Sequence, residues 1–155
     1  MVDIREVEND LIKSELTENI LRNLPEWFGN ERSLLEYIET VKGKKFYCAY
    51  YNNEAVGFLC LKINNSYTVD LYVTGILKEF HRQGIGRKLV ETAENYSKDN
   101  GYKFFMVKTL GESNDYEYYR RTRAFYLSVG FYPLEEFTQI WDKDNPCLIM
   151  VKNLY

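Results

Sequence analysis

A strand–helix–strand pattern in the middle of the chain constrains the fold most. An apolar strand is predicted over residues 67–76, an amphipathic helix over 84–100 and a second apolar strand over 104–109. Apolar residues recur in the helix at a 3.6-residue period, and Asn100-Gly101 is a typical helix stop. Two strands joined through a helix lie parallel in the same sheet. The chain therefore predicts an α/β fold that contains at least one parallel strand pair.

The elements on either side extend this unit into a larger mixed sheet. The first predicted helix carries Leu11, Ile12, Leu16, Ile20 and Leu24 at helical spacing, and Asn52-Asn53-Glu54 reads as a hairpin turn. Residues 111–119 are polar and read as a loop. The expected order is β-α-α-β-β-β-α-β-α-β-β. The flanking elements are a strand at 2–7, helices at 9–24 and up to about 41, strands at 45–51 and 55–63, a helix at 122–129, and strands near 131–140 and 147–153.

Length, charge and cysteine content exclude several classes of protein. A chain of 155 residues suits a single domain, here 1–155, and its net charge of −3 argues against a general nucleic-acid binder. No run is long and apolar enough for a membrane span, and the N-terminus is charged, so we expect a cytoplasmic protein. Three cysteines in apolar runs and a single histidine, His81, predict buried thiols and no metal site.

The segment Phe-His-Arg-Gln-Gly-Ile-Gly-Arg-Lys-Leu, residues 80–89, carries the most chemical information. It lies where a predicted strand ends and a helix begins, so unpaired backbone N–H groups point out of a positive helix end. Gly84 and Gly86 let a phosphate approach the backbone, while Arg82 and Arg87 add positive charge. The pattern is neither a Walker A loop nor a three-glycine dinucleotide fingerprint. An ordinary helix start with solvated arginines is the alternative.

Two motifs in this chain resemble the GNAT superfamily of acyl-CoA-dependent N-acetyltransferases. The family signature Q/R-x-x-G-x-G/A corresponds to residues 81–86, with His81 in place of Gln or Arg. Residues 123–131, Arg-Ala-Phe-Tyr-Leu-Ser-Val-Gly-Phe, are similar to the family's helix with a tyrosine followed by x-x-x-G-F. The resemblance implies a GNAT-like fold whose sheet splays between the fourth and fifth strands.

The resemblance also implies acetyl-CoA as co-substrate and a set of residues that bind it. The pantetheine arm would pair with backbone groups of Thr74, Gly75 and Ile76. The pyrophosphate would lie on Arg82, Gln83, Gly84, Ile85, Gly86 and Arg87. His81 would have a minor role at the phosphate end. Tyr119 stands where many relatives have an asparagine that contacts the cofactor.

Two residues are predicted to carry the catalysis. By the resemblance, Tyr126 takes the position of the tyrosine that protonates the leaving thiolate; a tyrosine packed in the core is the alternative. Asp70, in the fourth strand, is a candidate base for the acceptor amine, although it could equally be a structural aspartate. Glu112, Asp115 and a water chain are rival bases.

The sequence therefore predicts an N-acetyltransferase for a primary amine of a small molecule or a peptide. The amine would attack acetyl-CoA directly in a ternary complex, since no cysteine suggests an acyl-enzyme. Trp27, Phe28 and Trp141 could form an aromatic acceptor pocket. A non-catalytic acyl-CoA-binding or sensor module is the alternative. The oligomeric state stays open, a homodimer included.

Overall fold

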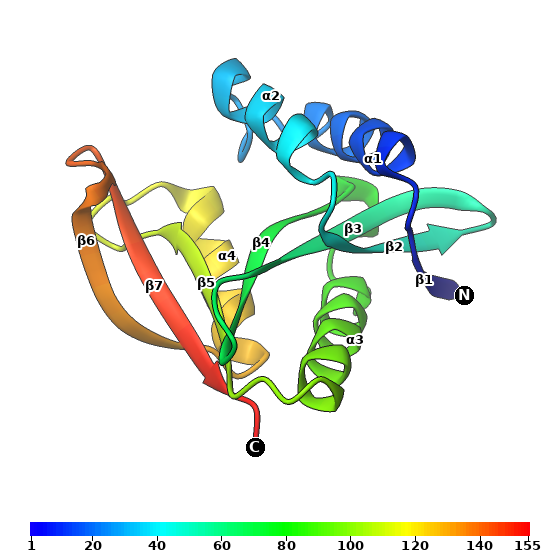
Figure 1. The fold of residues 1–155 in the computed structure, drawn as a ribbon. Coiled ribbons are helices and arrows are strands. Elements are labelled where there is room, and N and C mark those ends of the chain that lie inside the picture. The colour runs from blue at the N-terminus through cyan, green and yellow to red at the C-terminus, as the bar shows by residue number, and fades with distance from the viewer. The chain divides into compact units, whose positions relative to one another are not determined.

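The computed structural model describes all residues from Met1 to Tyr155, which form two compact units. The first unit consists of residues 1–62 and 72–96, and the second of residues 63–71 and 97–155. That residues 1–155 are one domain stays a prediction. The elements, shown in Figure 1, are β1 (Val2–Glu6), α1 (Asp10–Arg22), α2 (Glu31–Thr40), β2 (Lys45–Tyr51), β3 (Glu54–Ile63), β4 (Thr68–Ile76), the 3-10 turn η1 (Lys78–Phe80), α3 (Ile85–Asp99), β5 (Phe104–Leu110), α4 (Glu117–Ser128), β6 (Tyr132–Asp142) and β7 (Asn145–Asn153).

The strands pair in the order β1-β2-β3-β4-β5-β7-β6, as the predicted mixed sheet requires. Strands β4 and β5 are parallel, with pairs running from Thr68 and Phe104 to Leu71 and Val107. The pairs β1–β2, β2–β3, β5–β7 and β6–β7 are antiparallel. Beyond Leu71, β4 continues to Ile76 as part of the first unit. The parallel pair predicted from the strand–helix–strand pattern is therefore confirmed.

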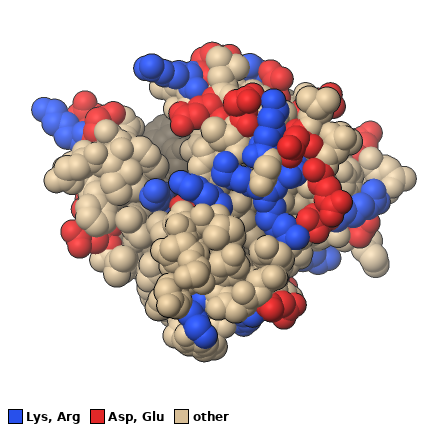
Figure 2. All heavy atoms as spheres, viewed as in Figure 1, with Lys and Arg blue, Asp and Glu red and all other residues tan.

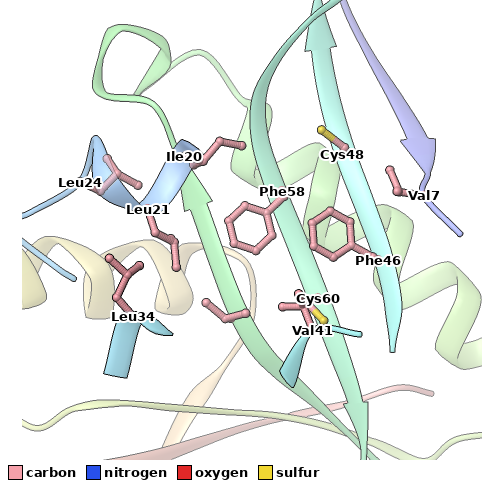
Figure 3. Close-up of a cluster of buried hydrophobic side chains, with 11 residues drawn as sticks. Val7, Ile20, Leu21, Leu24, Leu34, Val41, Phe46, Cys48, Phe58 and Cys60 are labelled. Atoms are coloured by element: carbon pink, nitrogen blue, oxygen red, sulfur yellow. The ribbon is translucent and has the colours of Figure 1, made fainter. Parts of the chain in front are cut away.

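The core of the first unit lies between the β2–β3 hairpin and the helices α1 and α2 (Figure 3). Phe46 of β2 and Phe58 of β3 are fully buried, and their rings stack with centroids 5.1 Å apart. Leu21 and Leu24 extend from α1 and the residues after it into the same cluster. In Figure 1, α1 and α2 cover one face of these strands and α3 the other. Strand β3 can therefore be apolar on both faces.

The helix predicted at 9–24 is present as α1, but not all of the apolar residues that predicted it are buried. Leu11 and Ile12 are 68% and 44% exposed, whereas Lys13 and Thr17 are buried. Lys13 lies inward because its ammonium group donates a 2.7 Å hydrogen bond to the Lys44 carbonyl, and the Thr17 hydroxyl donates to the Lys13 carbonyl. These bonds satisfy the polar groups that burial would otherwise leave without water. Ile20 and Leu24, later in the same apolar pattern, are buried, so the difference is confined to the first turns of the helix.

The β2–β3 turn is tighter than predicted. Asn52 and Asn53 both have left-handed backbone angles, with φ of 50° and 64°, and Glu54 already belongs to β3. Two consecutive left-handed residues form the turn type that matches the twist of a two-residue hairpin, and asparagine tolerates that conformation. The hairpin itself is confirmed.

The second unit contains the β5–β7–β6 strands and helix α4, which lies beside β5 in Figure 1. Helix α4 begins at Glu117, so the prediction of a loop through residue 119 and a helix starting at 122 is wrong. The first turn is polar, which hides it from a search for apolar periodicity. It is supported instead by the ion pair of Arg121 with Glu117, 2.8 Å apart and four residues along the helix.

Charged side chains of both signs lie on the molecular surface. The chain has 20 Lys and Arg against 23 Asp and Glu residues. On the face shown in Figure 2, Lys and Arg side chains gather near the middle, with Asp and Glu beside them. None of the helices combines the length and apolar character needed to cross a membrane.

Candidate functional site: an anion cradle at the start of α3

The turn between β4 and α3 has an unusual backbone. Arg82 has a φ of 61° and Gly84 a φ of 80°, so two residues in three are left-handed. A Cβ added to Gly84 would meet no atom within 4 Å, which leaves open space directly above its backbone. A glycine is needed for the conformation at this position, and its missing side chain keeps the space clear. We call residues 82–87 the cradle.

The cradle presents backbone N–H groups at the positive end of a helix of 15 residues. The first N–H groups of a helix have no partner within it, and the helix dipole adds partial positive charge. Arg82 and Arg87 are exposed beside them, whereas the Ile85 side chain is buried and anchors the turn to the core. This combination fits a phosphate or pyrophosphate group.

Gln83 belongs to the cradle by position, but its side chain forms a hydrogen bond within the turn. Its amide Nε2 donates a 3.1 Å hydrogen bond to the Glu79 carbonyl in η1. The Gly84 carbonyl accepts from the Lys88 amide, the first intrahelical bond of α3. The structure therefore brings the six predicted pyrophosphate residues together on one turn. The side chains of Gln83 and Ile85 contact the protein itself.

The end of β4, predicted to pair with the pantetheine arm, packs closely on its neighbours. The Thr74 hydroxyl donates a 2.7 Å hydrogen bond to the Phe58 carbonyl. A Cβ on Gly75 would lie 3.0 Å from side-chain carbons of both Leu21 and Leu24. Glycine at this position therefore allows α1 to approach β4, a packing role in addition to the predicted backbone role.

Ile76 lies at the junction of β4 and the cradle, where its carbonyl contacts the His81 ring. The distance between His81 Nε2 and the Ile76 oxygen is 2.6 Å. The same ring lies edge-on to Trp27, with centroids 5.6 Å apart. Sequence reasoning missed this contact, although two signals were present: a histidine where the family motif has Gln or Arg, and a tryptophan in a short loop.

Tyr126, the predicted acid, is 5% exposed on the inner side of α4. Its ring packs against Phe131 in a T-shaped arrangement, with centroids 5.7 Å apart. One turn earlier, the buried Arg123 donates a 2.6 Å hydrogen bond to the Leu110 carbonyl, which ties α4 to the end of β5. Burial of this kind suits either a positioned phenol or a core tyrosine, so the role of Tyr126 stays a prediction.

Asp70, the predicted base, is 4% exposed in β4, opposite Met106 of β5. The pKa of the nearby Cys147 thiol is raised, chiefly by burial and further by the negative charge of Asp70, while Lys108 opposes the shift. A buried carboxylate has a strong electrostatic effect on its surroundings, and its own protonation depends on its partners. Its catalytic role likewise stays a prediction.

The rival acids lie on the surface of the second unit. Glu112 and Asp115 line a depression of about 420 Å³ together with Arg120, Arg123, Ala124 and Leu127. Asp115 forms an ion pair with Arg120, which lowers the pKa of its carboxyl group. A carboxylate with a lowered pKa is a weaker base, which makes Asp115 less suitable for this task.

Tyr119, at the position where the resemblance predicts an asparagine in many relatives, is a poor proton donor or acceptor. Burial, and to a smaller extent Tyr116, raises its pKa to about 12. At neutral pH the phenol therefore stays neutral, and the side chain can act only through packing or as a neutral hydrogen-bonding group.

Known structures with the same fold include two that are described with coenzyme A or acetyl-CoA bound. A GNAT-family protein from Desulfovibrio desulfuricans matches with a TM-score of 0.84 at 16% identity, over 100% of both chains. An aminoglycoside 6'-N-acetyltransferase complexed with coenzyme A matches with a TM-score of 0.77 at 18% identity, over 99% of this chain and 97% of that one. A GNAT acetyltransferase from Elizabethkingia anophelis with acetyl-CoA bound matches with a TM-score of 0.68 at 17% identity, over 98% and 97%.

At such identities these likenesses show the fold. No curated protein sequence matches the chain significantly. The sequence profile of the Acetyltransferase (GNAT) family, however, matches residues 12–131, which include the cradle, Asp70 and Tyr126. The chain therefore belongs to the GNAT family of acetyltransferases, enzymes that use acetyl-CoA.

Proposed function

We propose that this enzyme transfers the acetyl group of acetyl-CoA to a primary amine of a small molecule or a peptide by direct attack in a ternary complex. The cradle carries the proposal, because the left-handed Arg82 and Gly84 leave open space above backbone N–H groups. The pyrophosphate of acetyl-CoA is the predicted occupant of that space. A panel of small and peptide amines with acetyl-CoA, with free thiol release as readout, tests the activity.

The proposed reaction forms one bond and breaks one. The neutral amine nitrogen attacks the thioester carbonyl carbon, a C–N bond forms, and the C–S bond breaks with its electron pair on sulfur. A base takes the amine proton, and an acid protonates the thiolate. An amine is mostly protonated at neutral pH, so removal of its proton is a requirement of the reaction.

We assign the acid role to Tyr126 and the base role to Asp70. A free phenol has a pKa of about 10 and a thiol of about 8.5, so Tyr126 can protonate a thiolate only when its surroundings favour the transfer. Two observations support the acid role of Tyr126: its place in the motif at residues 123–131 and its burial on α4. The base role of Asp70 is supported by its burial in β4. Carboxylates are also among the groups that act as general bases in enzymes.

Replacement of Asp70 by Asn tests the base. We expect Asp70→Asn to lower kcat without weakening CoA binding, and to remove the acid-side limb of the pH–rate profile, which reports an essential base. The measurements are kcat as a function of pH and calorimetric titration with CoA. Glu112→Gln, a change of a rival acid on the surface, is the matched control. An unchanged acid limb in Asp70→Asn would move the role to Glu112, Asp115 or water.

The three thiols provide a test of direct attack. Burial raises the pKa of Cys48 to about 11 and that of Cys60 to about 12, and it also raises the pKa of Cys147. Because the thiolate is the nucleophile, a raised pKa leaves little reactive form at neutral pH. We expect the folded enzyme to resist alkylation at pH 7 and to keep its activity, with labelling appearing only at strongly alkaline pH or after unfolding. Rapid inactivation by one equivalent of iodoacetamide would favour an acyl-cysteine route.

A further inference from the structure

The His81 side chain connects two segments of the first unit that are far apart in sequence. Its Nε2 lies 2.6 Å from the Ile76 carbonyl, and its ring lies edge-on to Trp27 at 5.6 Å. Trp27 belongs to the α1–α2 loop, residues 23–30. His81 directly precedes Arg82, the first left-handed residue of the cradle.

A second contact holds the α1–α2 loop next to the contact between His81 and Trp27. Lys78 in η1 donates a 2.8 Å hydrogen bond to Oε2 of Glu26, the residue before Trp27. The His81 backbone amide donates to the Lys78 carbonyl at 3.2 Å, so the two anchor points share one turn. Lys78, and more weakly His81, lowers the pKa of the Glu26 carboxyl group, which keeps it ionised for this ion pair.

The other side of the α1–α2 loop rests on α2. Phe28 packs edge-on against Tyr37 with centroids 6.0 Å apart, and the amides of Trp27 and Phe28 both donate to the Leu24 carbonyl. The loop is also compact, since a Cβ on Gly29 would lie 2.9 Å from the Pro25 carbonyl oxygen. These contacts tie Trp27 and Phe28 to the same carbonyl within one compact loop.

We propose that His81 is a positioning residue that couples occupancy of the cradle to the placement of the α1–α2 loop. A phosphate held on the backbone of residues 82–87 restrains Arg82 and with it the His81 ring, which in turn holds Trp27. The coupling matters for catalysis if the proposed function holds, because Trp27 and Phe28 are predicted from the sequence to belong to an aromatic pocket for the acceptor amine. Because coupling between two sites is reciprocal, a fixed Trp27 also favours CoA binding.

Trp27 fluorescence reports the coupling directly. The chain has two tryptophans, so a Trp141→Phe background leaves Trp27 as the only indole. We expect titration with CoA to change the Trp27 emission saturably, with a midpoint equal to the calorimetric dissociation constant. Trp27 lies outside the cradle and contacts the His81 ring, so the proposal routes the change through His81, and the His81→Gln variant tests that route. Absence of any change while calorimetry records CoA binding would overturn the proposal.

Replacing His81 by Gln separates coupling from binding. The glutamine amide can still donate to the Ile76 carbonyl, but the ring contact with Trp27 is lost. We expect CoA affinity to fall by about fivefold, the lower end of ordinary coupling between sites, and the CoA-dependent change in Trp27 emission to be largely lost with the ring contact. In a double-mutant cycle with Trp27→Leu, the effects on CoA affinity should be non-additive. A full Trp27 response in His81→Gln would contradict the role.

Tyr51→Leu is the matched control. It removes another aromatic contact near the cradle, that of Tyr51 with Phe80 of η1 at 5.5 Å, and does not involve the α1–α2 loop. The Trp27 response should survive in this variant. The readouts need only CoA, so they are independent of the acceptor. If the amine panel fails while the CoA-dependent Trp27 response holds, the acceptor assignment is wrong and the coupling stands. If the parent binds no CoA, the cradle assignment itself fails.

Discussion

Replacement of Tyr126 by Phe is expected to lower kcat by about 10²–10⁴, the usual scale for a positioned acid or base. The change removes one oxygen and keeps the ring that packs against Phe131. An acid is needed only when the thiolate leaves, so its hydroxyl stabilises the transition state more than the bound substrates. The value of KM and the thermal midpoint should therefore change little. Steady-state kinetics and thermal unfolding on one preparation provide both measurements.

A buried tyrosine elsewhere in the chain provides the control. Tyr47 of β2 is 7% exposed, and burial raises its pKa to about 12. Tyr47→Phe also removes a buried hydroxyl, and should leave kcat per folded molecule unchanged. If Tyr126→Phe altered stability and left turnover intact, Tyr126 would be a core residue. That outcome would also revive the reading of the domain as an acyl-CoA-binding module.

A carboxylate placed in the cradle is expected to abolish cofactor binding. Gly84→Asp would put a side chain into the open space above residue 84 and a negative charge where the pyrophosphate is predicted to lie. Two like charges about 4 Å apart near a protein surface repel by about 4 kcal/mol, and each 1.4 kcal/mol is tenfold in affinity. We expect CoA affinity to fall by about 100-fold or more, measured by calorimetry on the folded variant.

Two variants separate charge from backbone strain in this experiment. Gly84→Ala imposes the same left-handed strain without a charge, and its Cβ would meet no atom within 4 Å. Gly101→Asp places a carboxylate at a glycine with an almost equal φ of 81° and equally open space, beyond the other end of α3. Gly101→Asp should keep the CoA affinity of the parent, and Gly84→Ala should lose less affinity than Gly84→Asp, because it adds strain and a Cβ but no charge. Tight binding of CoA by folded Gly84→Asp would show that the cradle is assigned wrongly.

Short-range stereochemistry made much of the fold and the cradle predictable from the sequence. The signals used were strand and helix periods, the Asn52-Asn53 turn and the glycines before α3. Each depends on a few neighbouring residues, so it can be recognised in the sequence. The parallel pairing of β4 with β5 followed from the intervening helix. The family resemblance rested on the same local motif and on the residues around Tyr126.

The tertiary structure decided what depends on groups far apart in the chain. Lys13 turns inward because folding brings the Lys44 carbonyl close to it. The pattern of residues within the helix cannot reveal a partner so far along the chain. The first turn of α4 lacks an apolar face, so the start of this helix could not be recognised from an apolar period.

Contacts at the candidate site depend on the same long-range placement. His81 meets Trp27 only after β4 and the α1–α2 loop are packed together. The burial of Asp70 likewise follows from its place in the sheet. The sequence by itself thus determined most of the elements and the glycine-containing turn before α3, since these arise from local backbone geometry. Only the tertiary structure determined which side chains are buried and what they contact, because burial and long-range hydrogen bonds belong to the packed chain.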